Sequence, residues 1–362
     1  MPDESSRATE RETVRSHILF SIGVLTLVVL GALLLGRLAD VWLLTFGGAL
    51  LAVALHGMGA SLAERTPLPE VAAVGLVCVL SFAFAAVAVG WMGPAFIDGL
   101  VQLRQDLPMA LERVREFIDA RPELAELMQS ASRKMSNIEP GASVLGRIGD
   151  LFSTALGALS ALGSMLVGLF VIAVVAIYGA LRPEAYTGAL LAVLPTRHKR
   201  RAREVLLELA SALRWWLAGR VSSMLVVGVL TWLGLMLLGV PSAGTLGALS
   251  ALLSFVPNIG PIVSAIPAIL LGLGQSPTIA LYVVGLYALV QTVESYVVTP
   301  LIQQRVVALP PASIIVVQLA FGTALGLLGL LFATPLAVVA MVLIRMLWIE
   351  DGPDQEITLP RH

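Results

Sequence analysis

The chain has 362 residues, of which 57% are hydrophobic and only 13% are charged, and its mean hydropathy is +0.90. Soluble proteins are about 45–50% apolar and about 25% charged, so this chain has too few polar side chains to cover a folded surface in water. The formal net charge of −1 leaves no basic excess for nucleic acid. The composition therefore predicts an integral membrane protein and argues against one that binds nucleic acid.

Motifs for catalysis and for metal binding are absent from the sequence. The one cysteine, Cys78, excludes an internal disulfide and any zinc site with more than one thiolate. Neither Lys134 nor Lys199 follows the glycine-rich loop that would bind the phosphates of ATP. His56 stands alone in an apolar run, which favours a packed hydrogen-bonding role over metal ligation. We therefore expect no cofactor, no metal and no enzymatic activity.

Apolar runs that can cross a bilayer begin close to the N-terminus. A spanning helix needs about 20 predominantly apolar residues. After a cytoplasmic segment at 1–17, the sequence predicts three such helices within 18–97, at 18–36, 41–63 and 71–97. The first has a longer core than a cleaved signal peptide, so we expect it to be retained. A fourth spanning helix is predicted within 151–181.

Two polar segments separate these spans and set their orientation. The segment 98–150 repeats aliphatic residues at helical spacing between charged ones, which predicts amphipathic helices outside the bilayer. The segment 182–220 is rich in arginine and has an apolar face that includes Trp216, which predicts basic amphipathic helices along the inner membrane surface. Because excess Lys and Arg mark the cytoplasmic side, 98–150 is expected outside and both termini inside.

The region 221–347 predicts a transport core, and 348–362 a cytoplasmic tail. Two of its runs, 221–239 and 278–299, have the length of full spans, which brings the predicted total to about six. The apolar region 244–273 is different, because a cluster of proline, asparagine and glycine leaves arms too short to cross the bilayer.

The second broken region, 313–347, resembles the first. Its interruptions are Gly322, Gly326, Gly329 and Pro335. Pro310 lies 69 residues after Pro241, and Gly329 lies 69 residues after Gly260. The two regions are thus copies of one repeat, and each copy consists of a full span, a proline-marked loop and a broken region. Repeats with Gly/Pro-interrupted segments in matching positions indicate the binding site of a transporter.

The orientation of this repeat has two interpretations. If both broken regions are re-entrant hairpins, the copies are inverted and the hairpin tips meet near the middle of the membrane. If the regions instead cross completely, the loop 300–312 is external. Arg305 in that loop favours the hairpins. The predicted fold is thus all-α and polytopic, with two broken or re-entrant helical hairpins in an inverted repeat.

The first candidate for solute binding is the interruption of 244–273. Irregular backbone at membrane depth has free amide and carbonyl groups, which must be buried in protein or face a watery cavity. These groups and an asparagine amide would form a cradle for a small polar solute. The alternative is a kinked structural helix whose asparagine bonds to a neighbouring helix. The residues concerned are Pro257, Asn258, Ile259, Gly260 and Pro261.

The second candidate is Glu294, the only acidic residue in the predicted spans of 221–347. An ionisable side chain in a bilayer is costly and is a functional hypothesis by default. Gln291 and Ser295 share its helical face, and the group can exchange a proton or ligate a cation. A structural hydrogen bond to a hairpin tip is the alternative. For Gly326 and its glycine neighbours, close helix packing is the alternative to a binding role.

These motifs resemble the autoinducer-2 exporter family of bacterial inner-membrane proteins. The similarity at the level of motifs covers about 220 to 343. It rests on Leu238–Pro241, Phe255–Pro261, Ile266–Pro267, Val293–Glu294, Thr299–Ile302, Leu309–Pro310, Gly326–Gly329 and Ala333–Leu336.

The resemblance implies a transporter with two helical hairpins, an elevator-like movement and a homo-oligomeric state such as a pentamer. Some members of that family are similar to exporters of autoinducer-2, a quorum-sensing signal, and others to sodium(lithium)/proton antiporters. The positions that the resemblance adds to Pro257–Pro261 and Glu294 are Gly326, Gly329, Thr334 and Pro335.

Three functions follow as hypotheses. The first is export of a small polar metabolite such as autoinducer-2 through the bacterial inner membrane. The second is sodium/proton antiport, with Glu294 as the site of exchange. The third is a scaffold whose function resides in 98–150 and in the basic helix at 197–218, although a scaffold needs no glycine–proline break inside the bilayer.

Overall fold

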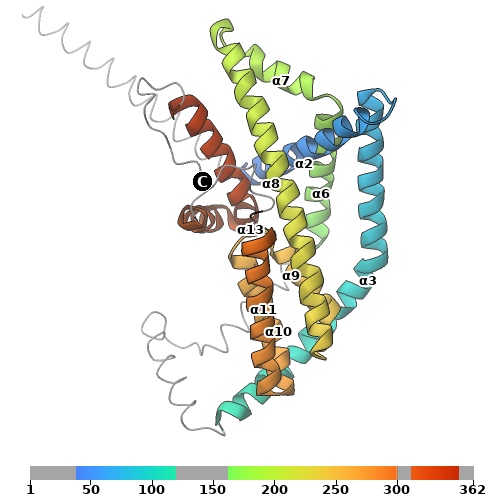
Figure 1. Cartoon of the computed structure of the whole chain (residues 1–362), viewed down its shortest axis with the longest axis vertical. Helices are drawn as coiled ribbons and strands as arrows, with labels where there is room; N and C mark the ends of the chain where they lie inside the picture. The colour runs from blue at the N-terminus through green and yellow to red at the C-terminus, as the bar shows by residue number, and fades with distance from the viewer. Residues whose placement is uncertain (1–37, 120–161, 299, 301–310, 350–362) are drawn as a thin grey trace, which may run out of the picture.

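The computed structural model describes residues 38–119, 162–298, 300 and 311–349 (Figure 1). Every regular element in this part of the chain is a helix. Five of the described helices are long and apolar enough to cross a membrane, or six if one bent pair counts as a single span. The prediction of an all-α polytopic membrane protein is therefore confirmed. The predicted span at 18–36 lies outside the described residues.

Three helices pack together near the N-terminal side of the chain, and their bounds are Ala39–Ala63 for α2, Glu70–Asp119 for α3 and Leu162–Leu181 for α6. Their shared core includes Leu55, Val74 and Cys78, so the cysteine is a packed hydrophobic residue. His56 on α2 lies with its Nδ1 3.0 Å from the carbonyl oxygen of Ala180 and its Nε2 3.5 Å from Glu70. This histidine connects all three helices.

Two predicted boundaries are corrected by the structure. The third span and the first part of the amphipathic segment, up to Asp119, form one helix, α3, which continues through Pro94 and Pro108. The rest of that segment lies outside the described residues. The basic helix and the span that begins at 221 likewise form one helix, α8 (Thr196–Leu237). A change from apolar to charged residues alters the surroundings of a helix without breaking its backbone hydrogen bonds, so a shift in composition does not by itself mark the end of a helix.

Proline does end a helix at the C-terminal end of α6. The helix α7 (Pro183–Ala192) begins at Pro183 and turns by 87° from the direction of α6. Proline lacks the amide hydrogen that a continuous helix needs and is well suited to a first helical turn. The element that runs across the bundle is therefore α7, whereas the basic part of α8 continues the line of its span (Figure 1).

Hairpin 1, which we define as Ala243–Gln275, consists of α9 (Ala243–Leu253) and α10 (Ile259–Gln275). Positive φ angles at Gly239 and Ser242 reverse the chain after α8, and α9 returns along α8 with Gly228 against Ala251. The amide of Gln275 then donates to the carbonyl of Gly239 at 3.0 Å. The two ends of the hairpin thus meet, and its arms fold back on each other.

Hairpin 2 is α13 (Pro311–Ile344), which bends at Gly326, where φ is 65° and ψ is −149°. Its arms run side by side, because Gly322 faces Leu330. The two hairpins use glycine in the same way. A Cβ on Gly260 would collide with the carbonyl oxygen of Leu253, and a Cβ on Gly329 with that of Phe321. In each hairpin a glycine after the bend lets the arms approach backbone to backbone.

The hairpins pack against different partners. Hairpin 1 lies between α3, α8 and α11 (Pro277–Val293), in a core that includes Leu103, Leu246 and Val283. The second arm of hairpin 2 lies against α2 and α8, in a core that includes Leu50, Leu213 and Val338. The helix α8 touches both hairpins and is the element between them.

Candidate functional site

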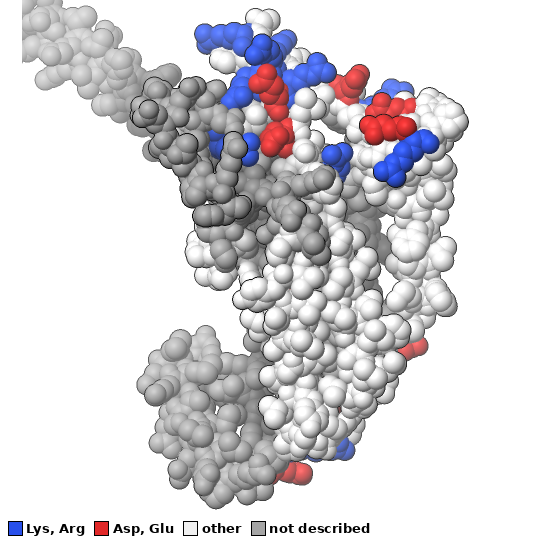
Figure 2. All heavy atoms as spheres, viewed as in Figure 1, with Lys and Arg blue, Asp and Glu red and all other residues white. Residues whose placement is uncertain are grey.

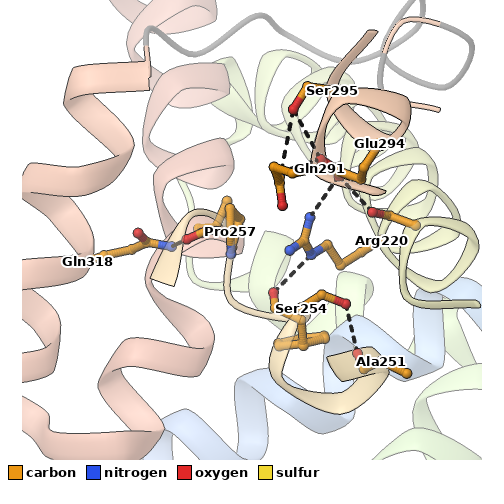
Figure 3. Close-up of polar contacts among 11 residues, drawn as sticks. Arg220, Ala251, Ser254, Pro257, Gln291, Glu294, Ser295 and Gln318 are labelled. Carbon is orange, nitrogen blue, oxygen red and sulfur yellow. Dashed lines mark hydrogen bonds and ion pairs between the residues drawn. The ribbon is translucent and has the colours of Figure 1, made fainter. Parts of the chain in front are cut away.

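An ion pair lies inside the apolar body of the protein, next to the tip of hairpin 1 (Figure 3). Nη1 of Arg220 on α8 is 3.8 Å from Oε1 of Glu294, which begins a short π-helical turn, Glu294–Val298, after α11. The two side chains are only 11% and 13% exposed. Single π-helical turns are rare and occur frequently at functional sites.

Both members of the pair have further hydrogen bonds. Ser223, one helical turn after Arg220, donates to Oε1 of Glu294 at 2.7 Å. The amide of Gln291 donates to Oε2 at 3.0 Å, and the hydroxyl of Ser295 lies 3.5 Å from the same oxygen. The predicted group of Gln291, Glu294 and Ser295 therefore shares one polar cluster. A buried charge is tolerated when it is paired and hydrogen-bonded in this way.

Arg220 also connects the ion pair to hairpin 1. Its Nε donates to the carbonyl oxygen of Phe255 at 2.9 Å, and the ring of Phe255 packs edge-on against Trp216 at 5.9 Å. One guanidinium thus contacts the carboxylate on one side and the hairpin tip on the other. Sequence reasoning missed this residue, because it counted Arg220 with the cytoplasmic charges of 182–220. The isolated acid at Glu294 was the signal, since a buried carboxylate requires a partner.

The hairpin tip has the irregular backbone that its sequence predicts. Asn258 has φ 65° and ψ −45°, close to the conformation of a γ-turn, and the amide of Ile259 donates to the carbonyl oxygen of Pro257 at 2.7 Å across it. Its side chain is exposed and caps neither helix, and no hydrogen bond joins it to another described residue. The alternative in which Asn258 bonds to a neighbouring helix therefore has no support among the described contacts.

A second contact joins the tip to hairpin 2. The amide of Gln318, on the first arm of hairpin 2, donates to the carbonyl oxygen of Pro257 at 3.1 Å and lies 3.4 Å from Oγ1 of Thr334 on the second arm. Gln318 is fully buried and Thr334 is 5% exposed. Sequence reasoning missed Gln318, although it is the only amide side chain in the apolar run 311–344, and that isolation was the available signal.

The predicted residues of hairpin 2 divide into two groups. Thr334 lies where the two hairpins meet, and its neighbour Pro335 is fully buried. Gly326 and Gly329 instead form the bend and the close approach of the arms. Among the described residues no hydrogen bond or ion pair joins these two glycines to the tip of hairpin 1.

The chemistry of this arrangement is that of a neutral polar site. The guanidinium of Arg220 and the carboxylate of Glu294 cancel in charge, and the remaining groups are hydroxyls, amides and backbone carbonyls. Within the described residues, no three His, Cys, Asp or Glu side chains gather where they could hold a metal ion. The site offers hydrogen bonds in an apolar body rather than a net charge.

Known proteins similar to this chain are named as putative transport proteins or putative permeases. The chain is 26% identical over 307 residues to "Putative permease PerM" of Escherichia coli K12, and the match covers 84% of each chain. It is 27% identical over 143 residues to "Putative transport protein YueF" of Bacillus subtilis, which is 40% of this chain and 39% of that one. It thus spans about two fifths of YueF, and it spans 42% of "Putative transport protein YrrI" from the same organism.

A family profile covers much more of the sequence than the paired comparisons with the Bacillus proteins. The profile described as "AI-2E family transporter" matches residues 20–348, which include the ion pair, the tip of hairpin 1 and all of hairpin 2. The motifs at 238–261, 293–302 and 326–336 lie within this match. The chain therefore belongs to the AI-2E transporter family.

Proposed function

We propose that this protein is a secondary transporter that exports a small polar metabolite, such as autoinducer-2, across the bacterial inner membrane. One observation carries the proposal: the broken tip of hairpin 1 is hydrogen-bonded at Phe255 by Arg220, which is itself paired with Glu294. Irregular backbone in a membrane must be buried in protein or line a watery cavity. Transporters bind their substrates at discontinuous helices of this kind.

The charge balance of the site supports a solute without net charge. An anion would meet the Glu294 carboxylate, and a cation would meet the Arg220 guanidinium, each at the cost of the existing ion pair. A neutral solute with hydroxyl groups can exchange hydrogen bonds with the tip carbonyls and with the amides of Gln291 and Asn258. We therefore favour a hydroxylated metabolite over an ion as the transported species.

The movement that we propose is elevator-like, with hairpin 1 as part of the mobile body. Its tip is held from two sides, by Arg220 on α8 and by Gln318 on hairpin 2. Separation of the tip from either partner would expose the carbonyl oxygen that the partner now contacts. Breaking these few hydrogen bonds costs little compared with unpacking an apolar core, so the tip is a suitable place for a gate.

Sodium(lithium)/proton antiport is the second candidate. The observation in its favour is the position of Glu294, because both carboxylate oxygens already accept hydrogen bonds from side chains that a bound cation would displace or join. In that mechanism Arg220 would leave the carboxylate when the cation arrives. The pair would then act as a switch between a cation-bound and a guanidinium-bound state.

Transport by purified protein in liposomes with an imposed pH gradient separates the two functions. We would measure autoinducer-2 flux and sodium-driven proton movement for the wild type and for Glu294→Gln. The matched control is Glu208→Gln, which removes the acid of a half-exposed ion pair with Arg345 at 3.9 Å, away from the hairpin tip.

Solute flux without sodium–proton exchange supports the exporter. In that case Glu294→Gln should slow the flux, because the guanidinium loses its partner, while Glu208→Gln leaves it unchanged. Proton movement that is driven by sodium and lost in Glu294→Gln, with no solute flux, would overturn the exporter in favour of the antiporter.

We also propose that α7 and the start of α8 face the cytoplasm, together with both chain termini. Lys and Arg side chains gather at that end of the protein, whereas the middle is almost free of charge (Figure 2). Such an excess marks the cytoplasmic side. Labelling of single cysteines placed at Arg200 and Arg113, in a Cys78→Ser background, should give cytoplasmic and external accessibility respectively.

A homo-oligomer is the assembly that we propose, with a pentamer as the expected size. The apolar helix α3 exposes large side chains along its length, including Phe84 at 76% and Trp91 at 83%. Lipid can cover such a surface, and so can a second copy of the chain. Native mass spectrometry from nanodiscs would decide between them, and a monomer would contradict the proposed assembly.

A further inference from the structure

The carboxamide of Gln318 has a fixed orientation. The carbonyl oxygen of Pro257 can only accept a hydrogen bond, so the group 3.1 Å from it must be the NH₂ of Gln318. The same NH₂ group lies 3.4 Å from Oγ1 of Thr334. Both contacts use the NH₂ group, so neither of them gives the carboxamide oxygen, Oε1, a hydrogen-bond donor.

This oxygen is buried and accepts no hydrogen bond from any described residue. Gln318 as a whole has no exposed surface. Buried side-chain oxygens nearly always have a donor, and each exception requires an explanation. An apolar residue of similar size would fill the same space without this cost, so the glutamine is unfavourable for stability alone.

The position of Gln318 suggests the explanation. Its side chain reaches from hairpin 2 to Pro257, at the break in the backbone of hairpin 1 (Figure 3). The next residue, Asn258, has positive φ and an exposed amide without a partner among the described residues. Separation of the two hairpins would therefore expose an unsatisfied acceptor on Gln318 and the side-chain amide of Asn258 to the same space.

We infer that Oε1 of Gln318 binds the transported solute by accepting a hydrogen bond from one of its hydroxyl groups. This inference rests on the proposed function and adds a contact that selects the solute. An acceptor-only atom cannot bind a carboxylate or a phosphate, which themselves offer acceptors. A metal cation needs several oxygen ligands, whereas the other groups that Gln318 touches are already used in accepting from its amide. A neutral, hydroxylated solute is the chemistry that fits.

The test is equilibrium binding to the full-length protein in nanodiscs, with radiolabelled autoinducer-2 and radiolabelled ribose as the probes. Gln318→Met keeps the length of the side chain and removes both hydrogen-bonding groups. The matched control is Gln275→Met, because Gln275 also donates its amide to a backbone carbonyl, that of Gly239 at 3.0 Å, but at the exposed base of hairpin 1. Loss of one neutral hydrogen bond should raise the Kd about 2- to 12-fold in Gln318→Met and leave it unchanged in the control.

A change in the probe separates solute binding from support of the hairpin. Among ribose analogues that each lack one hydroxyl group, the analogue without the hydroxyl that donates to Gln318 should bind the wild type about 2- to 12-fold more weakly than ribose, and Gln318→Met should bind the two equally. If Gln318 only holds hairpin 1 through its NH₂ group, Gln318→Met should weaken binding of ribose and of every analogue by the same factor, and that result overturns the inference. Wild-type protein that binds neither probe saturably also overturns it, as does binding of sodium that depends on Gln318.

Binding and flux together distinguish this inference from the proposed function. Autoinducer-2 flux in liposomes that is unaffected by Gln318→Met would support the exporter and refute the solute contact. Binding of ribose or autoinducer-2 that depends on Gln318, in a protein that moves neither across a bilayer, would support the contact and refute the transport function.

Discussion

The two hairpins share a backbone design but differ in what surrounds their bends. In each, a glycine after the bend lies against a carbonyl oxygen of the opposite arm. The tip of hairpin 1 accepts hydrogen bonds from Arg220 and Gln318, on two different elements. The bend of hairpin 2 at Gly326 is exposed and receives no side-chain hydrogen bond from another described element. The same fold thus supplies one tip with polar partners and one without.

This difference suggests that the parts of the two hairpins near the site differ in how easily they can move. A tip that is held by a few hydrogen bonds can be released and re-formed at low cost, whereas an arm packed in an apolar core cannot move without opening that core. Thr334 and Gln318, which lie on the arms of hairpin 2, belong to the second kind. The arms of hairpin 1 are packed in a core of their own, so we infer that the tip of hairpin 1 is the part that opens first and that Gln318 and Thr334 of hairpin 2 form a wall of the site.

The largest expected effect comes from breaking the ion pair. Arg220→Met leaves the Glu294 carboxylate without its cation, and removal of one partner of a buried pair typically costs about 3–5 kcal/mol. We expect a loss of that size in thermal or denaturant unfolding in detergent. The double variant Arg220→Met/Glu294→Leu should recover most of the stability while transport stays lost, because it removes both charges.

The half-exposed pair of Arg345 and Glu208 is the matched control for this prediction. Exposed ion pairs contribute about 0–1 kcal/mol, so Arg345→Met should be nearly neutral. Equal effects of Arg220→Met and Arg345→Met would show that the buried position of Arg220 is energetically unimportant.

The next largest effect is expected at Gly260 and Gly329, the glycines that follow the bends of the two hairpins. A methyl group at Gly260 or Gly329 would collide with backbone, and overpacking of this kind costs about 1–3 kcal/mol. We expect Gly260→Ala and Gly329→Ala to lower the unfolding temperature similarly, but only Gly260→Ala to alter binding of autoinducer-2 strongly. Gly285→Ala on α11 is the control, because no atom lies within 4 Å of its added Cβ.

A further effect, of backbone origin alone, is expected at the bend of hairpin 2. A Cβ on Gly326 meets no neighbouring atom, so the cost of Gly326→Ala comes from its φ of 65° and ψ of −149°. Essentially only glycine adopts this region, and another residue there costs about 1–3 kcal/mol. Gly326→Asn should lose as much stability as Gly326→Ala in unfolding measurements, because asparagine tolerates the left-handed helical region, where ψ is positive, and not this one. Recovery of stability by asparagine would contradict this origin.

The sequence was sufficient for the fold class and for the location of the first bend. The run Pro257–Pro261 breaks a helix for local steric reasons, whereas in 313–347 only Gly326, one of four predicted interruptions, carries the bend. The sequence was insufficient for the helix bounds at 97 and 220, where the surroundings of a continuous helix change. Gln318 stands out as the only amide in its apolar run, but its partners on hairpin 1 and on the second arm of hairpin 2 arise from contacts between residues far apart in the chain. The solute-binding and coupling roles of the predicted residues stay predictions.

Removal of one hydroxyl group would show whether hairpin 1 moves as a unit. Tyr287 on α11 hydrogen-bonds to Ser250 on α9 at 2.9 Å and donates to the carbonyl of Ser264 on α10 at 3.1 Å, so one hydroxyl joins both arms to α11. Tyr287→Phe removes that group and should cost about 0.5–1.5 kcal/mol for each hydrogen bond it breaks. Hydrogen exchange should then accelerate in both arms of hairpin 1 and stay unchanged in hairpin 2. Tyr282→Phe is the control, because Tyr282 is 57% exposed on the same helix. Faster exchange in α9 alone would mean that the arms open separately, and a tip whose arms open separately could not carry a solute as one body.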